Sequence, residues 1–431
     1  MIVLFKILQV ILALSLLIIV HEAGHFLFAK LFHIRVEKFY LFFDVGGKAL
    51  LKFKKGETEF GIGWLPFGGY CKISGMIDES MDLESMKKEP QEWEFRSHPA
   101  WQRLLVMAGG VLFNFIFAIL AFSIISGIWG SAYIPNRQAQ IYPNELARDM
   151  GFRSGDHIIS IDDYEPSDFS SLQADLIRRE GHKVQVLRGT DTVNVYMDQA
   201  RTAEILNSPM MFDLALPFIV DSVSAPENAK ELARGDRILS IDGQSTEFFQ
   251  DAQPVLKACA GSTAKAQILR DGQVVTVPIQ VDSAGRIGIY LKAPNVERRH
   301  YNALESVGQG VKRTGSTITG YVQDLKLVAK PSTGAYKSVG SFIAIGQVFP
   351  SKWDWFQFLN IVALLSIMLG VMNLIPIPGL DGGHILFTLY EMVSGRKPSE
   401  KFLMVMQIIG MFLLFMLMFL AFGNDISRLI K

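Results

Sequence analysis

Two histidines and a glutamate stand inside one of the most apolar runs of this sequence. The stretch LIIVHEAGHFLFAK, residues 17–30, carries His21, Glu22 and His25 in the pattern H-E-x-x-H. On a helix, residues four apart project from nearly the same face, so both imidazoles can reach one metal ion. Zinc suits neutral imidazole ligands, and a neighbouring carboxylate can take a proton from water. The pattern predicts a zinc site with His21 and His25 as ligands and Glu22 as general base.

Three ionisable groups within five residues are costly in an apolar helix. Each costs about 3 kcal/mol at the centre of a membrane span on insertion scales. A polar cluster without function at a helix interface is the alternative, but this cost makes such a cluster hard to maintain. A catalytic zinc needs a third protein ligand and an open position for water. We therefore expect another ligand elsewhere at the same depth.

A second polar stretch interrupts apolar sequence at VMNLIPIPGLDGGH, residues 371–384. Its polar side chains include Asn373 and Asp381, and two prolines between them break the helical hydrogen bonds. At membrane depth, such a break is tolerated only where protein or a cavity covers the freed backbone. Asp381 is the predicted third ligand, which completes a His₂–carboxylate zinc site. His384 competes as a ligand, but it stands where the next helix is expected to begin.

The elements that carry these residues are predicted to cross a membrane. The chain has 431 residues, 49% of them hydrophobic and only 19% charged, and the apolar residues gather in long runs. A helix needs about 20 apolar residues to cross the hydrocarbon. Four runs meet this requirement: one that begins near Ile2, then 104–129, 355–380 and 402–424. A cleaved signal peptide is the alternative for the first run, but no small-residue cleavage site follows it.

Lysines and arginines near the span ends indicate the orientation. The loop after the first span carries four of them, against Lys6 alone on the other side: Lys30, Arg35, Lys38 and Lys48. The positive-inside rule therefore predicts a cytoplasmic segment at 30–103 and both termini outside. The segment 130–354 is then outside, and the two motifs meet at matching depth. Lys+Arg and Asp+Glu are balanced at 42 each, so the chain shows no electrostatic footprint for nucleic acid.

The long outer segment contains an internal repeat. SGDHIISID at residues 154–162 returns as RGDRILSID at 234–242, an offset of 80 residues. A repeat of that length is the size of a small domain, so we predict two copies of one domain. The G-D-x-I-x-x-I-D pattern resembles PDZ domains, which bind peptides by strand addition. The copies could bind peptide or act as a steric gate, and both roles stay open.

Two further segments could contribute to the site. GETEFGIGWLPFGGYCKISG, residues 56–75, is predicted to form a β-hairpin whose edge, with Gly61 and Gly63, pairs with an unwound substrate. An ordinary amphipathic cytoplasmic hairpin is the alternative. In AGGVLFNF, Gly110 and Asn114 stand four residues apart. Close helix packing explains the glycines most simply, whereas Asn114 could hydrogen-bond to the substrate or to the site.

Together the two polar motifs resemble those of a known family. HEAGH in a first span and N-x-x-P-x-P-x-L-D-G-G in a later span are similar to the site-2 proteases, which are intramembrane zinc metalloproteases. The PDZ-like pair between the second and third of four spans resembles their Gram-negative branch, the regulator-of-sigma-E proteases. This resemblance implies that His21, His25 and Asp381 bind Zn²⁺, that Glu22 is the base, and that residues 56–75 re-enter the membrane.

The resemblance also implies substrates and a location. The substrates would be single-pass membrane proteins already trimmed outside by another protease, such as anti-sigma factors, and signal-peptide remnants. The enzyme would lie in the bacterial inner membrane with its PDZ-like domains in the periplasm. We expect four side chains or backbone positions to contact the substrate or the transition state: Asn373, Asn114, Gly61 and Gly63.

The predicted fold is a membrane protein with four transmembrane helices, a re-entrant β-hairpin and two periplasmic PDZ-like α+β domains. The predicted domains are a first span with the metal motif, a cytoplasmic loop with the hairpin, a second span, two PDZ-like domains, a periplasmic linker helix region and two further spans. In the same order they cover residues 1–30, 31–103, 104–130, 131–208, 209–295, 296–354, 355–381 and 402–424.

Two other functions compete with proteolysis. A catalytically inactive PDZ scaffold or chaperone would share the fold, but such a protein would be free to lose Glu22. A transporter would also carry buried polar residues and broken helices. The H-E-x-x-H spacing and the lack of a second broken helix in another half of the chain argue against a transporter.

Overall fold

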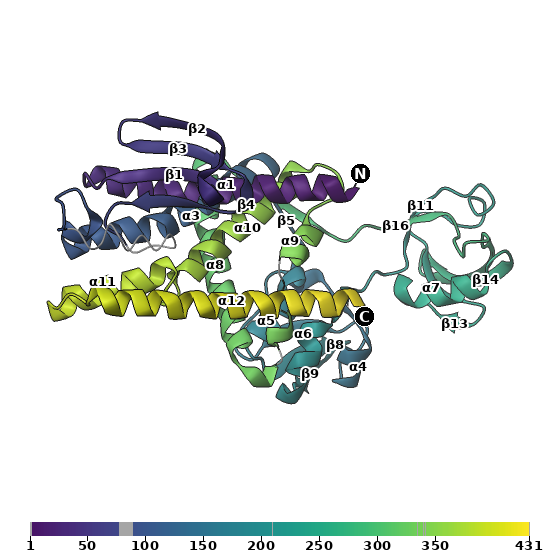
Figure 1. The fold of residues 1–431 in the computed structure, drawn as a ribbon. Helices are drawn as coiled ribbons and strands as arrows, with labels where there is room; N and C mark the ends of the chain where they lie inside the picture. The colour runs from purple at the N-terminus through teal and green to yellow at the C-terminus, as the bar shows by residue number, and fades with distance from the viewer. Residues whose placement is uncertain are drawn as a thin grey trace. The chain divides into compact units, whose positions relative to one another are not determined.

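The chain forms two compact units in the computed structural model, which describes residues 2–76, 89–208, 210–333, 335–338, 340 and 342–430. We call residues 1–130 with 300–431 the helical unit and residues 131–299 the repeat unit (Figure 1). The helical unit contains both polar motifs of the sequence. The repeat unit contains both copies of the internal repeat.

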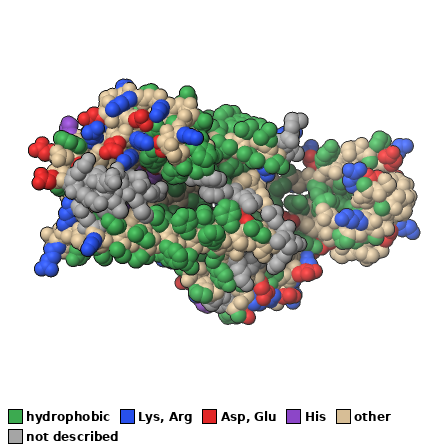
Figure 2. Space-filling view, in the orientation of Figure 1, with side chains coloured by type: hydrophobic (Ala, Val, Ile, Leu, Met, Phe, Trp, Pro, Cys, Tyr) green, Lys and Arg blue, Asp and Glu red, His purple; other side chains and the backbone are tan. Residues whose placement is uncertain are grey.

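Four helices of the helical unit are long and apolar enough to cross a membrane, among the residues that the structure describes. They are α1 (Ile2–Leu31), α3 (Ala100–Trp129), α10 (Trp355–Leu374) and α12 (Glu400–Ile430). Helices α1 and α10 pack against α3, and the amino end of α1 and the carboxyl end of α12 lie at the same end of the unit (Figure 1). Hydrophobic side chains cover much of the visible face of these helices (Figure 2). This composition confirms the prediction of a membrane protein with four apolar helices.

Small residues allow α1 and α3 to approach closely. A Cβ atom on Gly24 would collide with the backbone of Gly109, and one on Gly109 would collide with Gly24 in return. Side chains larger than hydrogen would separate the two backbones, as at other close helix crossings in membranes. The crossing lies one residue from His25, so it fixes the spacing of the two helices at the metal motif.

The predicted third span is too long at its carboxyl end. Helix α10 ends at Leu374 rather than at 380 or 381, because Pro376 and Pro378 cannot donate the backbone hydrogen bonds that would extend it. Residues 375–380 form an irregular turn, in which the N–H of Leu380 donates to the carbonyl of Ile377. A separate helix, α11 (Asp381–Ser394), then begins at the predicted ligand and packs against α3.

The segment after α1 folds into a four-stranded sheet. Its strands are β1 (Val36–Phe43), β2 (Ala49–Lys55), β3 (Thr58–Gly63) and β4 (Leu65–Ile73). Their order is β2-β3-β1-β4, with β1 parallel to β3 and antiparallel to β4. A short 3₁₀ turn, Val45–Gly47, lies between β1 and β2.

The predicted hairpin at residues 56–75 is therefore wrong. Its two strands, β3 and β4, are not partners, because β1 lies between them. The hairpin of this sheet is β2–β3, which turns at Gly56 and Glu57. Consequently β3 has a neighbour on each side, and within the described part of the chain β2 and β4 carry the open edges. Alternation of residue types shows which segments are strands, but it does not show which strands pair.

Further helices complete the helical unit. Helix α8 (Ala303–Ala329) begins with a reciprocal cap between Asn302 and Glu305 and packs along α3, where Gly310 meets Ser123. The remaining short helical segments are a 3₁₀ turn at Phe95–Ser97, two more at Pro331–Thr333 and Ala335–Ser338, and α9 (Phe342–Val348). Part of the predicted linker region thus packs on a candidate membrane helix.

The two copies of the repeat share a central series of a strand, a helix and a strand pair, and each copy has further elements of its own. The first copy contains β6 (Ile141–Pro143), α4 (Glu145–Asp149), β7 (His157–Ile161), α5 (Leu172–Arg178), β8 (Lys183–Arg188), β9 (Asp191–Tyr196), α6 (Thr202–Asn207) and β10 (Phe212–Leu214). The second contains β11 (Val220–Val223), β12 (Arg237–Ile241), β13 (Gln244–Ser245), α7 (Phe249–Ala258), β14 (Thr263–Arg270), β15 (Gln273–Gln280) and β16 (Ile289–Leu291). Each copy has its own hydrophobic core.

The aspartate of each G-D pair makes a buried ion pair, which explains why both copies of the repeat carry an aspartate there. Asp156 accepts two hydrogen bonds from Arg188, and Asp236 accepts two from Arg270, with both carboxylates at most 1% exposed. Charge-assisted, bidentate pairs of this kind fix geometry as well as adding energy. The motif therefore holds the start of β7 or β12 to the end of β8 or β14, the first strand of the pair that follows the helix.

The predicted boundary between the copies falls a few residues early. Strand β10 pairs with β6, so Phe212 belongs to the first copy, whereas Phe218 lies in the core of the second. The repeat unit also extends past the predicted end at residue 295, because β5 (Ser131–Tyr133) pairs with β17 (Glu297–Arg299). Pairing between residues distant in sequence, which repeat spacing does not report, sets both limits.

Candidate metal centre

The two histidines of the apolar motif lie on one face of α1 with their rings in contact. His21 and His25 are 7% and 5% exposed, and their Nε2 atoms are 3.2 Å apart. The rings meet edge to face, at 85°. Two neutral imidazoles with adjacent Nε2 atoms present lone pairs to the same point in space, which is the arrangement of metal ligands.

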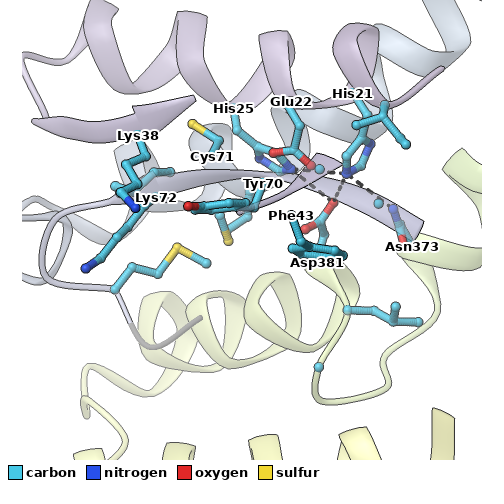
Figure 3. A pocket seen from close by; sticks show the side chains of 18 of the residues that line it. His21, Glu22, His25, Lys38, Phe43, Tyr70, Cys71, Lys72, Asn373 and Asp381 are labelled. Carbon is cyan, nitrogen blue, oxygen red and sulfur yellow. Dashed lines mark hydrogen bonds and ion pairs between the residues drawn. The ribbon is translucent and has the colours of Figure 1, made fainter. Parts of the chain in front are cut away.

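Asp381 approaches the histidines from the first residue of α11 (Figure 3). Its Oδ2 lies 3.3 Å from Nε2 of His21 and 3.4 Å from Nε2 of His25. Ligands about 2.0–2.1 Å from a tetrahedral zinc lie about 3.3 Å from one another. The same Oδ2 atom is buried without a hydrogen-bond partner in the structure. Three acceptor atoms at this spacing, one of them an unsatisfied carboxylate oxygen, fit a zinc ion.

Each histidine has a partner for its other ring nitrogen. The Nδ1–H of His25 donates to the backbone carbonyl of Val106 across 2.8 Å. The side-chain Nδ2 of Asn114, a fully buried residue, lies 3.0 Å from Nδ1 of His21, while its Oδ1 has no hydrogen-bond partner. Amide nitrogen and oxygen are interchangeable by a half turn of the side chain, and with Oδ1 toward the ring Asn114 accepts the Nδ1 proton that a histidine bound through Nε2 carries. Both partners come from α3, so α3 orients both rings.

Gly110 makes room for the histidine rings. A Cβ atom there would lie 2.5 Å from Nε2 of His25 and 2.6 Å from Cε1 of His21. Van der Waals contact does not allow carbon to approach so closely. The sequence suggested close packing for these glycines. In the structure, Gly109 packs against the backbone of α1, and Gly110 packs against the rings of the predicted ligands.

Glu22 faces a cavity of about 720 Å³ beside the histidines (Figure 3). The cavity lies between α1, the open edge strand β4, the turn before α11 and parts of α10 and α12. The backbone N–H of Cys71, in β4, donates a hydrogen bond to the Glu22 carboxylate. This contact places the carboxylate against the cavity and next to both histidines. Since it accepts hydrogen bonds in this position, it can serve as a base toward water in the cavity.

Charged and aromatic side chains from the sheet line one side of the same cavity. Lys38 and Asp44 form an ion pair at 2.7 Å, and the Tyr70 hydroxyl donates to Asp44 at 2.7 Å. Burial alone would raise the pKa of Asp44, but the hydrogen bonds from Lys38 and Tyr70 outweigh it and hold that pKa below its ordinary value. Asp44 therefore stays charged at neutral pH and keeps Tyr70 in place beside the cavity.

The other predicted site residues divide into two groups. The Asn373 amide lies 3.3 Å from Nε2 of His21 and faces the cavity, on the last turn of α10. Gly61 and Gly63 lie in the inner strand β3, and neither lines this cavity. His384 lines the cavity from the first turn of α11, but the cluster of ligand atoms formed by His21, His25 and Asp381 does not include it.

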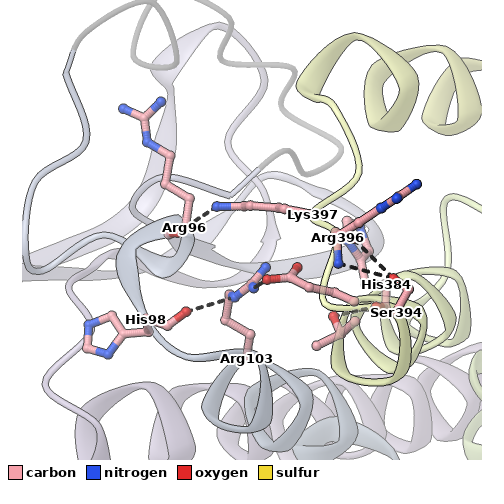
Figure 4. A network of polar contacts seen from close by, with 9 residues as sticks. Arg96, His98, Arg103, His384, Ser394, Arg396 and Lys397 are labelled. Atoms are coloured by element: carbon pink, nitrogen blue, oxygen red, sulfur yellow. Dashed lines mark hydrogen bonds and ion pairs between the residues drawn. The ribbon is translucent and has the colours of Figure 1, made fainter.

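A polar network that the sequence reasoning missed holds α11 to α3 (Figure 4). Arg103, 7% exposed, pairs with Glu391 at 2.5 Å and donates to the carbonyl of His98. Lys397, just beyond α11, donates to the carbonyl of Arg96. An arginine near the end of an apolar run could have suggested a partner, but nothing in the pattern indicates which acid it meets. The network anchors the helix whose first residue is Asp381.

Comparison with known proteins places this geometry in a family. The family model described as peptidase family M50 matches residues 9–417. The chain is 30% identical to "Protease RseP" of Yersinia pestis, with 97% of this chain and 98% of that protein covered. It is 28% identical to "Regulator of sigma-E protease RseP" of Salmonella typhimurium, with the same coverage. It is also 28% identical, over 99% of both chains, to a Vibrio cholerae protein named "Putative zinc metalloprotease".

Proposed function

Because the chain belongs to peptidase family M50, the site-2 proteases, we propose that this zinc metalloprotease hydrolyses peptide bonds within single transmembrane helices. The observation that carries the proposal is the meeting of His21 and His25, which lie on one of the helices apolar enough to cross a membrane, with Asp381 at the first residue of α11. A hydrolytic site on such helices is accessible to peptide bonds of a neighbouring transmembrane segment. A protease that acts on water-exposed chains would have no use for this location.

The residues of the metal centre have separate roles in the proposed reaction. His21 and His25, through Nε2, and Asp381, through a carboxylate oxygen, would hold the zinc ion. Zinc bound there supplies a Lewis acid that polarises the scissile carbonyl and activates water. Glu22 accepts the proton of the attacking water and delivers it to the leaving amine nitrogen. Asn114 and the carbonyl of Val106 keep both rings in the tautomer that leaves Nε2 to the metal.

Asn373 would contact the reacting carbonyl. Its amide lies on the metal side of His21, at the end of α10, and can donate to an oxygen that gains negative charge. A donor aimed at the developing charge stabilises the transition state more than the substrate. The geometry supports this role for Asn373, whereas Asn114 is already engaged with the ring of His21.

The substrate helix must unwind before it is cut, because every carbonyl in a transmembrane helix is hydrogen-bonded. The open edge of β4 lines the cavity beside Glu22, so an unwound segment could pair with it as an added strand. The sequence predicts this pairing for the edge of a hairpin at 56–75 that includes Gly61 and Gly63. Because those residues lie in the inner strand β3, we assign the pairing to β4.

The remaining proposals concern location and substrates. The positive-inside rule supports an inner-membrane enzyme with both termini and the repeat unit outside. The names of the relatives from Yersinia pestis and Salmonella typhimurium support a substrate in sigma-E regulation, such as a single-pass anti-sigma factor. The PDZ-like repeat unit would then admit substrates already trimmed outside and reject intact ones, by binding or by obstruction. Signal-peptide remnants would meet the same criterion.

Replacement of Glu22 by glutamine tests the proposed chemistry. The amide keeps the size of the side chain but cannot accept the proton, so proteolysis should stop while zinc stays bound. Zinc content would be measured on purified protein, and cleavage on a single-span substrate in detergent. A Glu22→Gln protein without zinc would show that Glu22 is a ligand. A wild-type protein that binds the substrate and zinc without cutting would favour the inactive scaffold.

The native cysteine of β4 can report the conformation of the bound substrate. The chain has two cysteines, neither in a disulfide, and Cys259→Ser would leave Cys71 alone. In a Glu22→Gln background, single cysteines placed along the substrate span should form disulfides with Cys71 at every second position, because side chains of a strand alternate. Disulfides with a spacing of three to four residues would instead indicate a helical substrate and refute strand pairing.

A further inference from the structure

One polar side chain in the cavity has no role in the chemistry described so far. Of the described side chains of helix α12, a single one lines the cavity, that of Gln407. The helix is uncharged and apolar from 402 to 423 apart from this amide. Gln407 is 5% exposed, and the structure shows no hydrogen bond for its amide within the described residues. The amide faces the cavity, so its donor and acceptor are available to a molecule that enters the cavity.

The packing of α12 brings this amide to the cavity. Between residues 401 and 420, all of which the structure describes, only Gln407 and Gly410 are buried. A Cβ atom on Gly410 would collide with the carbonyl of Pro378, so α12 rests directly on the backbone of the turn before Asp381. Gln407 is three residues earlier and thus on the same face of the helix. The contact that docks α12 therefore presents Gln407 beside the metal centre.

An extended substrate would lack partners on one of its edges. When a strand is added to β4, alternate N–H and C=O groups point to β4, and the others point away from it. Within the membrane, the groups that point away have no water to bond. A glutamine side chain carries both a donor and an acceptor, like a peptide group, so it can pair with such groups. Gln407 lines the cavity from a different element than β4 does.

We propose that Gln407 binds the unpaired backbone edge of the unwound substrate and thereby contributes to its affinity. This inference rests on the proposed cleavage of transmembrane helices and names a further substrate-binding residue for it. The contact is to the backbone, so it is independent of the side chains of the substrate. It should be made with the bound, extended substrate before any bond is broken.

The test measures binding separately from cleavage. A synthetic single-span peptide would be titrated in detergent against Glu22→Gln protein, with and without Gln407→Leu, which removes the amide at similar volume. The expected result is a Kd about tenfold higher with leucine, equivalent to about 1.4 kcal/mol, with zinc content unchanged. Ile408→Leu is the matched control, because Ile408 is the next residue of α12 and 49% exposed. Its Kd should equal that of the parent.

Ester substitutions in the peptide identify the contact. An ester lacks the N–H donor of the amide and has a weaker carbonyl acceptor. At one position of the span, an ester should weaken binding to the protein with Gln407 and have no further effect with Gln407→Leu. In proteins with Glu22 intact, Gln407→Leu should raise KM while kcat changes less than twofold.

Three results would overturn the inference. An equal Kd for Gln407→Leu and its parent would show that the amide is not used by the substrate. A loss of zinc in Gln407→Leu would show that the residue supports the turn before Asp381 and not the substrate. Ester effects that are the same in both proteins would exclude a backbone contact. If the wild-type protein cut no single-span substrate, the proposed function would fail, and the Kd values would still decide on Gln407.

Discussion

Replacement of Gly110 by alanine should weaken zinc binding by this protein without unfolding its helices. The new Cβ atom would lie 2.5 Å from Nε2 of His25, whereas ordinary contacts begin near 3.4 Å, so the rings would have to retreat by about 0.9 Å. Ligand distances in a metal site vary by only about 0.2 Å. Disturbance of the groups around metal ligands typically costs 10–100-fold in affinity, and we expect about 100-fold here.

The same substitution should favour the helix itself. Alanine in place of glycine stabilises a helix interior by about 1 kcal/mol. Gly127→Ala is the matched control, because it is in the same helix and its Cβ would meet the side chain of Ser306, with the hydroxyl oxygen at 3.2 Å. Zinc affinity would be measured by competition with a chelating dye, and helix content by circular dichroism. If Gly110→Ala bound zinc within twofold of Gly127→Ala, the geometry of the centre described above would be wrong.

Two further predictions concern the supports of the fold. Glu391→Gln should lower zinc affinity about tenfold, because Arg103 no longer holds the helix that begins at Asp381. The double variant Arg103→Glu/Glu391→Arg should recover part of the lost affinity. Equal zinc affinity of the wild type, the single variant and the double variant would refute the anchor. In the repeat unit, Asp236→Asn should destabilise the second copy by about 2–3 kcal/mol, which faster hydrogen exchange of β12 and β14 would reveal. Burial alone would raise the pKa of Asp236, but Arg270 and the N–H of Ala233 hold it below its ordinary value, so its stabilisation is present at neutral pH and lost as pH falls below about 4. Asp236→Asn should therefore flatten the acid loss of stability, and an unchanged acid profile would exclude this carboxylate as its cause.

Local patterns in the sequence were sufficient to predict the two histidines of the candidate metal centre, the four apolar helices and the repeated domain. His21 and His25 lie on one face because a helix returns every 3.6 residues, and this spacing is present in the motif itself. Apolar runs of sufficient length identified the four helices, since the hydrocarbon thickness fixes the length required. The repeated G-D pairs marked two copies of one domain because each aspartate makes the same buried pair with arginine.

Contacts between distant segments were decided only by the tertiary structure. Asp381 was predicted as a ligand from the sequence. Its position beside His21 and His25, which are 360 and 356 residues earlier in the chain, depends on the Arg103–Glu391 anchor and on the turn that follows α10. The strand order β2-β3-β1-β4 could not be read from alternation, because each strand fits several partners locally and the packing of the whole sheet selects among them. Gly110 and Gln407 look like ordinary helix residues in the sequence. Gly110 is required because α1 approaches α3 so closely that only hydrogen fits, and Gln407 faces the cavity because α12 rests on the turn before Asp381.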